Sequence, residues 1–289
     1  MFQYKFMIIA FIVGALLGVI IPLVGSTAVY KRLSNTGDAL AHTSLSGVAI
    51  GLVAGLNPLI TSLIMCLISI LIIEFIRKKF SKYAEMGVAV VLSAGIGVAG
   101  ILTSYTNVSN FDSYLFGSIL LIDDTELYLV IGLFVCVVLF YVLFDKQILA
   151  TIYNEEEAKV QGIKVNLINF TQSILLALTI ALSAKTIGSL IVSSLIVLPV
   201  ATALQLKQSY KITMFSSLII SLVSTLTGIT CSYYLDIKPG ATIIIVSVIQ
   251  LLIFLCIKPI ITYAQKRKSL AWTYYFLLAS SLTILESIS

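Results

Sequence analysis

The side chains with the clearest capacity for chemistry lie in the stretch GDALAHTSLSG, residues 37–47, whose surroundings are strongly apolar. His42 is the single histidine of the 289-residue chain, and Asp38 stands one helical turn before it. Asp38, His42 and Ser46 are spaced i, i+4, i+8, so an α-helix places them along one slowly drifting stripe. Carboxylate oxygen and imidazole nitrogen suit Zn, Mn or Fe better than Cu(I). We therefore interpret Asp38 and His42 as candidate ligands of a divalent transition metal.

The depth of His42 in the expected helix supports this interpretation. At the helical rise per residue, His42 lies about 15 Å beyond Arg32, which is roughly half the thickness of a hydrocarbon core. Ionisable groups at that depth cost at least ~2.5 kcal/mol, so they normally face a polar cavity and mark an ion or substrate path. In a second interpretation, Asp38 caps the start of the helix and His42 is a buried, hydrogen-bonded core residue. The residues alone leave both interpretations open.

The elements that must position this pair are membrane helices. Hydrophobic residues make up 59% of the chain and charged residues only 11%, against roughly 25% charged in an ordinary soluble domain. Apolar runs long enough to cross a bilayer as helices recur along the chain, whereas the strands of a barrel would be shorter and alternating. The sequence therefore predicts an all-α fold, a polytopic membrane helical bundle.

Nine apolar runs separated by polar breaks predict about nine transmembrane helices. We place them at 6–29, 37–56, 58–76, 87–105, 126–144, 166–184, 187–206, 213–234 and 241–262. Residues 1–265 would then form the transmembrane permease domain, with its longest polar interruption at 145–164. Residues 266–289 form a basic cytoplasmic segment, in which the weaker apolar run 271–285 is either a further membrane helix or an interfacial one.

The net charge of +5 comes from Lys and Arg that cluster in every second break. With nine spans, all five basic breaks fall on one side, which the positive-inside rule assigns to the cytoplasm, with the N-terminus outside. Charge arranged in this way indicates a membrane orientation and no nucleic-acid partner. The basic breaks are Lys31 with Arg32, 77–82, 145–164, Lys207 with Lys211, and 265–268.

Several enzyme classes are excluded by missing motifs. The chain has no GxxxxGK[ST] phosphate-binding loop and too few acidic residues for a nucleotide-hydrolysing domain, so any ATP chemistry must belong to another chain. It has no HExxH, and its four cysteines show no CxxC spacing. Gly47, Gly51 and Gly55, spaced by four, instead predict a face where helices approach closely.

Five ordered blocks of the sequence resemble the ABC-3 family, the membrane permeases of ATP-binding-cassette importers for zinc, manganese and iron. The resemblance covers roughly residues 6–262; Val200 and Ser46 depart from the family pattern. The blocks are RLSNTGDALAHTSLSGVAIGL at 32–52, YLFGSIL at 114–120, NEEEAKVQGI at 154–163, TIGSLIVSSLIVLPVATA at 186–203 and YYLDIKPGATIIIV at 233–246.

The resemblance implies a type II ABC importer-like permease that binds no permanent cofactor and carries Mn, Zn or Fe as its substrate. The family's metal-path residues fall on Asp38 and His42. The acidic cytoplasmic run corresponds to the helix that docks into the ATPase subunit; the alternative is a solvated loop helix that touches nothing. The docking residues would be Glu155, Glu156, Glu157, Ala158 and Gly162.

The implied partners are a second copy of the chain, two ABC ATPase subunits and an extracytoplasmic metal-binding lipoprotein, in the plasma membrane of a prokaryote. The chain itself would be a non-hydrolytic subunit. A first rival is an ATP-independent secondary metal/proton transporter, which needs proton-carrying acids in several spans, whereas Asp38 and Glu74 are nearly the only candidates. A second rival is a membrane scaffold protein without a substrate.

Overall fold

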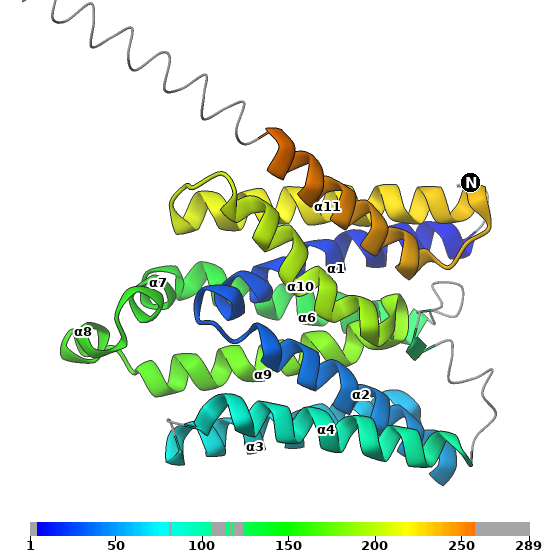
Figure 1. Ribbon diagram of the computed structural model, residues 1–289, viewed down its shortest axis with the longest axis horizontal. Helices are drawn as coiled ribbons and strands as arrows, with labels where there is room; N and C mark the ends of the chain where they lie inside the picture. The colour runs from blue at the N-terminus through cyan, green and yellow to red at the C-terminus, as the bar shows by residue number, and fades with distance from the viewer. Residues whose placement is uncertain (1–4, 81–82, 106–113, 116, 118–123, 258–289) are drawn as a thin grey trace, which may run out of the picture.

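The chain folds as a bundle of helices, most of them roughly parallel or antiparallel (Figure 1). The computed structural model describes residues 5–80, 83–105, 114–115, 117 and 124–257. The helices are α1 (Lys5–Tyr30), α2 (Ser34–Ala54), α3 (Pro58–Lys79), α4 (Ala84–Thr103), α6 (Asp124–Leu143), α7 (Asp145–Tyr153), α8 (Glu155–Val160), α9 (Val165–Ser183), α10 (Ser189–Leu204) and α11 (Tyr210–Leu235). A π-helical turn, Ala184–Gly188, joins α9 to α10, and a last helix spans Pro239–Ile257.

Seven helices of the described part are long and apolar enough to cross a membrane, so the protein is a multi-pass membrane protein. The predicted count of nine spans is not confirmed, although each of the nine apolar runs is mostly helical in its described part. The two that fall outside the seven are α2 and α10. Helix α10 has 16 residues, about 24 Å of rise against a core of about 30 Å. Helix α2 is long enough, but it carries Asp38, His42 and several hydroxyl side chains.

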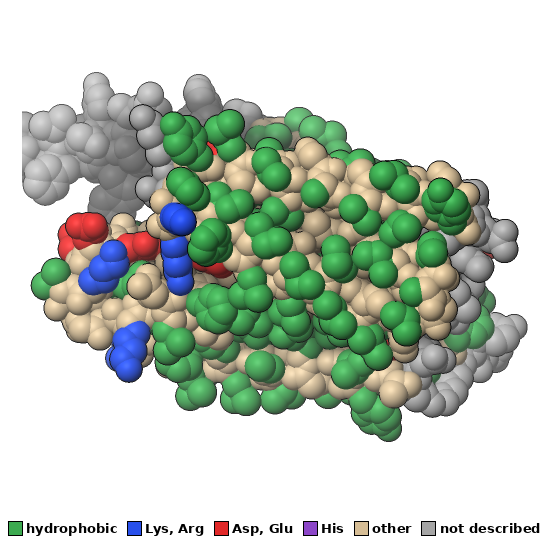
Figure 2. Space-filling model, turned by 90° about the horizontal axis from the view of Figure 1, so that it is seen from below, with side chains coloured by type: hydrophobic (Ala, Val, Ile, Leu, Met, Phe, Trp, Pro, Cys, Tyr) green, Lys and Arg blue, Asp and Glu red, His purple; other side chains and the backbone are tan. Residues whose placement is uncertain are grey.

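The helices pack in two groups that α9 and α10 join. Helix α1 packs against α10 and α11, while α2 packs against α3 and α4; α9 contacts both α1 and α3. Fully buried side chains such as Leu17, Ile180 and Leu195 fill the space between α1, α9 and α10. The outer faces carry exposed apolar side chains that suit lipid, and Figure 2 shows them spread along the flank of the bundle.

Local sequence signals explain how several helices begin and end. Pro58 opens α3, and the Asn57 side chain before it accepts a hydrogen bond from the Leu59 N–H, 3.0 Å away. Helix α2 ends at Gly55, whose φ of 66° is in the left-handed region that favours glycine. Pro22 and Pro199 lie inside α1 and α10, and neither ends its helix.

The basic breaks gather at one end of the bundle, where α7 and α8 project (Figures 1 and 2). Lys31, Arg77 and Glu155 line one cavity there, and Lys211 is ion-paired with Asp145, 2.5 Å apart. Four of the five predicted basic breaks therefore share an end, and the fifth, 265–268, lies outside the described residues, as does the segment 266–289. The cytoplasmic orientation of this end stays a prediction of the positive-inside rule.

Glycines allow α2 to lie directly on the backbone of α3. A Cβ atom on Gly47 would lie 2.6 Å from the Ser62 Cα and 2.7 Å from the Thr61 carbonyl oxygen, and one on Gly51 would lie 2.8 Å from the Pro58 Cα. This confirms two positions of the predicted packing stripe. The third, Gly55, has no atom near its Cβ position and serves as the helix cap.

We expect Gly47→Ala to lower the free energy of unfolding by about 1–3 kcal/mol, because the new methyl group has no room against the α3 backbone. Gly100→Ala is the matched control, since its Cβ would meet no atom within 4 Å. Thermal unfolding of the detergent-solubilised protein measures both. Equal melting temperatures for the two variants would contradict the close α2–α3 contact.

Candidate metal site and cytoplasmic segment

Asp38 lies inside α2 and does not cap it. The helix begins at Ser34, its N-cap residue is Leu33, and no side chain caps it by a hydrogen bond. At position 38 the backbone is already helical, so the Asp38 carboxylate lies too far along the helix to cap its free N–H groups. The interpretation of Asp38 as a helix cap is therefore wrong.

Asp38 and His42 lie along the open edge of a helix that is otherwise largely enclosed. Asp38 is exposed and His42 is half-buried in the single chain, whereas their neighbours Ala39, Leu40 and Ala41 are buried. Within the described residues, neither Asp38 nor His42 makes a hydrogen bond or ion pair. His42 is therefore not the hydrogen-bonded core residue of the second interpretation.

Ser46 does not continue the stripe as a ligand. It is fully buried, and its hydroxyl donates to the Thr43 carbonyl oxygen, 2.8 Å away. The available donor atoms on this edge are therefore one carboxylate and one imidazole. The described part of the chain contains no group of three or more His, Cys, Asp and Glu side chains that could hold a metal. One chain thus offers two such donors, half of a four-ligand set.

The two buried carboxylates of the described helices are each paired with a basic side chain. Glu74, near the end of α3, accepts from Arg77 and from the Ser173 hydroxyl. Glu126, at the start of α6, is ion-paired with Lys185 of the π-helical turn. These pairings explain how the bundle tolerates both acids, whereas Asp38 of α2 has no ion pair or hydrogen bond to another described residue.

The segment 145–164, which the sequence predicts to be cytoplasmic, forms two short helices, α7 and α8, that project from the bundle (Figure 1). Asn154 caps α8: its side-chain oxygen accepts from the Glu156 and Glu157 N–H groups, and its amide donates to the Glu157 carboxylate. Gly162, with φ of 80°, ends it, because the N–H groups of Gly162 and Ile163 turn back to the Lys159 and Ala158 carbonyls. The predicted helix with a glycine stop is confirmed.

The five predicted docking residues divide by exposure. Glu155, Glu156, Glu157 and Gly162 are exposed, whereas Ala158 is buried and faces the rest of the protein. Ala158 therefore seats α8 against the bundle and is not on its outer face. Val160, which the sequence did not single out, is 90% exposed at the end of α8. An apolar side chain as exposed as Val160 is the kind of residue that a binding partner commonly covers.

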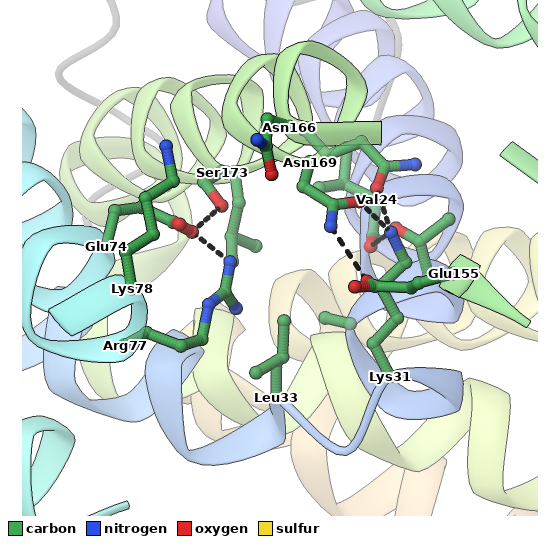
Figure 3. Close-up of a pocket in the computed structure, with 14 residues that line it drawn as sticks. Val24, Lys31, Leu33, Glu74, Arg77, Lys78, Glu155, Asn166, Asn169 and Ser173 are labelled. Atoms are coloured by element: carbon green, nitrogen blue, oxygen red, sulfur yellow. Dashed lines mark hydrogen bonds and ion pairs between the residues drawn. The ribbon is translucent and has the colours of Figure 1, made fainter. Parts of the chain in front are cut away.

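A cavity of about 340 Å³ lies at the same end, between α1, α3, α8 and α9 (Figure 3). On one side of it are Glu74 and Arg77. On the other side, the Lys31 ammonium donates to the Asn169 side-chain oxygen at 2.5 Å and to the Gln172 side-chain oxygen at 2.9 Å. The Asn169 amide in turn donates to the Glu155 carboxylate at 2.8 Å. The cavity thus brings the acidic segment and the α1–α2 junction into one network.

Burial lowers the pKa of Lys31 from its usual value near 10.5 to about 8. Desolvation disfavours the ammonium form, and the carboxylate of Glu155 partly offsets it by raising the pKa. Lys31 therefore loses its proton as the pH rises through about 8, whereas an ordinary lysine keeps it to about pH 10.

The sequence interpretation missed this network and the Glu126–Lys185 pair. Asn166, Asn169 and Ser173 recur every three to four residues at the start of an apolar helix, with Gln172 beside Ser173, and that spacing signals a polar face. Lys185 stands alone within a long apolar stretch, which by itself indicates a buried ionisable group in need of a partner.

Comparison with known proteins identifies relatives whose similarity extends over most of the chain. The model of the ABC 3 transport family matches residues 3–258. A probable metal transport system membrane protein of Treponema pallidum is 37% identical over 258 residues, which are 89% of this chain and 97% of that protein. The high-affinity zinc uptake system membrane protein ZnuB of Haemophilus influenzae is 31% identical over 250 residues, 85% and 95% of the two chains.

A solved structure has the same arrangement of helices. PsaBC from Streptococcus pneumoniae, determined in complex with Fab, superposes with a TM-score of 0.77 at 25% sequence identity. The match covers 87% of this chain and 91% of that one. The bundle is therefore a known membrane fold, and its helix order is shared by that protein.

We expect acylation of Lys31 by acetic anhydride to rise with pH through a midpoint near 8, because only the neutral amine reacts. Glu155→Gln should move the midpoint to lower pH, since it removes the charge that favours the ammonium. Mass spectrometry of the labelled peptide over pH 6–11 measures both midpoints. A midpoint near 10.5 in the unaltered protein would show that Lys31 is not buried.

Proposed function

This chain belongs to the ABC-3 transport family, and we propose that it is the membrane permease subunit of an ATP-driven importer for a divalent transition metal. Two proteins that it resembles are named as metal transport and zinc uptake membrane proteins. The observation that carries the proposal is the pair of unpartnered metal donors, Asp38 and His42, on the open edge of a membrane helix. Mn, Zn and Fe all accept this donor pair.

A second copy of the chain would complete the metal site. Asp38 is exposed in the single chain although it lies within a helix of a membrane bundle, and in this proposal the second copy covers it. If two copies meet at this edge of α2, two carboxylates and two imidazoles form a four-ligand set around a two-fold axis. The metal would then pass along the seam between the copies, where each ligand set can open and close.

The energy source would be two ATPase subunits docked on the cytoplasmic end. The chain carries no phosphate-binding loop of its own. Exposed Glu155, Glu156, Glu157 and Val160 on the projecting α8 offer charged and apolar contacts to such a partner, and the buried Ala158 holds the helix in place. An extracytoplasmic metal-binding lipoprotein would deliver the metal to the opposite end. Transport would proceed by alternating access as the ATPases move the two bundles.

The paired acids favour this mechanism over a proton-driven one. A secondary metal/proton transporter needs several acids that bind and release protons within the spans. Glu74 and Glu126 are ion-paired with Arg77 and Lys185 respectively, so neither is a free acid that could carry protons alone.

We expect His42→Ala to abolish metal uptake, because it removes the chain's single imidazole, and Asp38→Asn to lower uptake strongly, because it removes the charge that offsets a dication. Ser46→Ala is the control on the same stripe, since its hydroxyl bonds only to the backbone of its own helix. Uptake of isotopically enriched Mn²⁺ or Zn²⁺ by the reconstituted transporter measures all three. Near-normal uptake by both ligand variants would falsify the metal-site assignment.

Reversing the charge at Glu155 and Glu156 should lower ATP hydrolysis that is stimulated by the loaded binding protein, while the permease stays in the membrane. Each single reversal, Glu155→Lys and Glu156→Lys, is compared with Glu85→Lys, the same charge change at the start of α4 on the same end of the bundle. Hydrolysis by purified complexes provides the measurement. If the α8 variants and the α4 control behave alike, α8 is a solvated helix without a partner.

A further inference from the structure

Lys31 and Asn169 lie beside Glu155 of the projecting helix α8 and are joined to it by a chain of hydrogen bonds (Figure 3). Asn169, on α9, donates to Glu155 of α8 and accepts from Lys31, which immediately follows α1. The amide group of Asn169 thus donates one hydrogen bond and accepts another. Both bonds have a charged partner, so each is stronger than a hydrogen bond between two neutral groups. Gln172, one turn along α9, accepts a second bond from Lys31.

The turn after Lys31 is stiff. The Leu33 N–H donates to the Ala28 carbonyl at 2.7 Å and the Arg32 N–H to the Val29 carbonyl at 3.0 Å, the pattern that closes a helix end. Arg32 has a φ of 58°, in the left-handed region that a non-glycine residue adopts only when its surroundings hold it there. The Thr36 N–H then donates to the Leu33 carbonyl, already within the first turn of α2.

The other end of the connection is also well defined. Asn154 and Gly162 fix the two ends of α8 by hydrogen bonds, and buried Ala158 seats it. When α8 is displaced, Glu155 therefore moves together with the whole helix. Because Glu155, Asn169 and Lys31 are bonded in sequence, the displacement is carried to the α1–α2 turn, and Asp38 lies seven residues beyond Lys31.

We propose that Asn169 and Lys31 are positioning residues that transmit movement of α8 to α2 and so set the metal pair Asp38 and His42. This inference rests on the proposed function, in which α8 receives the ATPase. It assigns a role to two residues that neither bind the metal nor lie on the exposed face of α8.

The alternative is that these polar side chains only line a hydrated cavity. Asn166 separates the two possibilities. It lies on α9 one turn before Asn169 and lines the same cavity, yet among the described residues its side chain forms no hydrogen bond. A role in hydration predicts equal effects at both asparagines, whereas transmission predicts an effect at Asn169 alone.

Lys31→Met separates transmission from folding. Burial disfavours the ammonium of Lys31, as its lowered pKa indicates, so an uncharged side chain of similar length offsets part of the cost of the lost hydrogen bonds, and the melting temperature is measured beside the activity. The same change removes the bonds to Asn169 and Gln172. A residue with a merely structural role would not lose function while the protein keeps or gains stability.

The experiment measures Mn²⁺ or Zn²⁺ uptake and ATP hydrolysis together in the complete transporter, reconstituted in liposomes with its ATPase and binding protein. The variants are Asn169→Leu, Lys31→Met, the control Asn166→Leu, and Glu156→Lys as a test of docking. We expect the ratio of metal transported to ATP hydrolysed to fall about fivefold or more in Asn169→Leu and Lys31→Met. Asn166→Leu should keep the ratio within about twofold of the unaltered protein.

Unchanged ratios in Asn169→Leu and Lys31→Met would overturn the inference, and so would an equal loss in Asn166→Leu. If Asn169→Leu fails to fold, Lys31→Met decides on its own. Glu156→Lys distinguishes the two levels of the proposal. A loss of stimulated hydrolysis in Glu156→Lys with normal ratios in the Asn169 and Lys31 variants keeps the docking function and removes only the transmission path.

Discussion

The close approach of α2 to its neighbours is the constraint on which the rest of the structure depends. Gly47 and Gly51 let its backbone lie against α3, and Gly95 of α4 leaves no room for a side chain beside the backbone of His42 and Thr43. In lipid, where apolar surface gains little by association, such contacts and buried hydrogen bonds hold helices together. A helix as polar as α2 can therefore be enclosed on most sides, which leaves one edge for Asp38 and His42.

The fold class, the helical register of α2 and the capped acidic helix could be predicted from the sequence because each depends on local spacing. Asp38 and His42 were found by residue type and depth alone, although their exposure on a single edge required the packed structure. Membrane crossing was harder to predict. Seven described helices are long and apolar enough to cross a membrane, whereas α10 is short and α2 is polar, so the predicted count of nine is not confirmed.

The side chains that pair over long sequence distances could not be predicted. Lys31 meets Asn169 across 138 positions, and Lys185 meets Glu126 across 59. No periodicity links such residues, since the helices that carry them are brought together only by the order in which the bundle packs. The spacing of polar residues along α9 signals that a partner exists, and only the structure identifies it as the end of α1 and the start of α8.

The exposure of Asp38 has a consequence for how the protein is made. A single copy released into the bilayer holds a carboxylate on its surface within the membrane, at a cost on the order of 2 kcal/mol or more. Any molecule that covers this edge removes the cost, so an orphan subunit is less stable than an assembled one. If the proposed second copy covers this edge, the carboxylate is exposed to the membrane only in a chain that has not yet assembled.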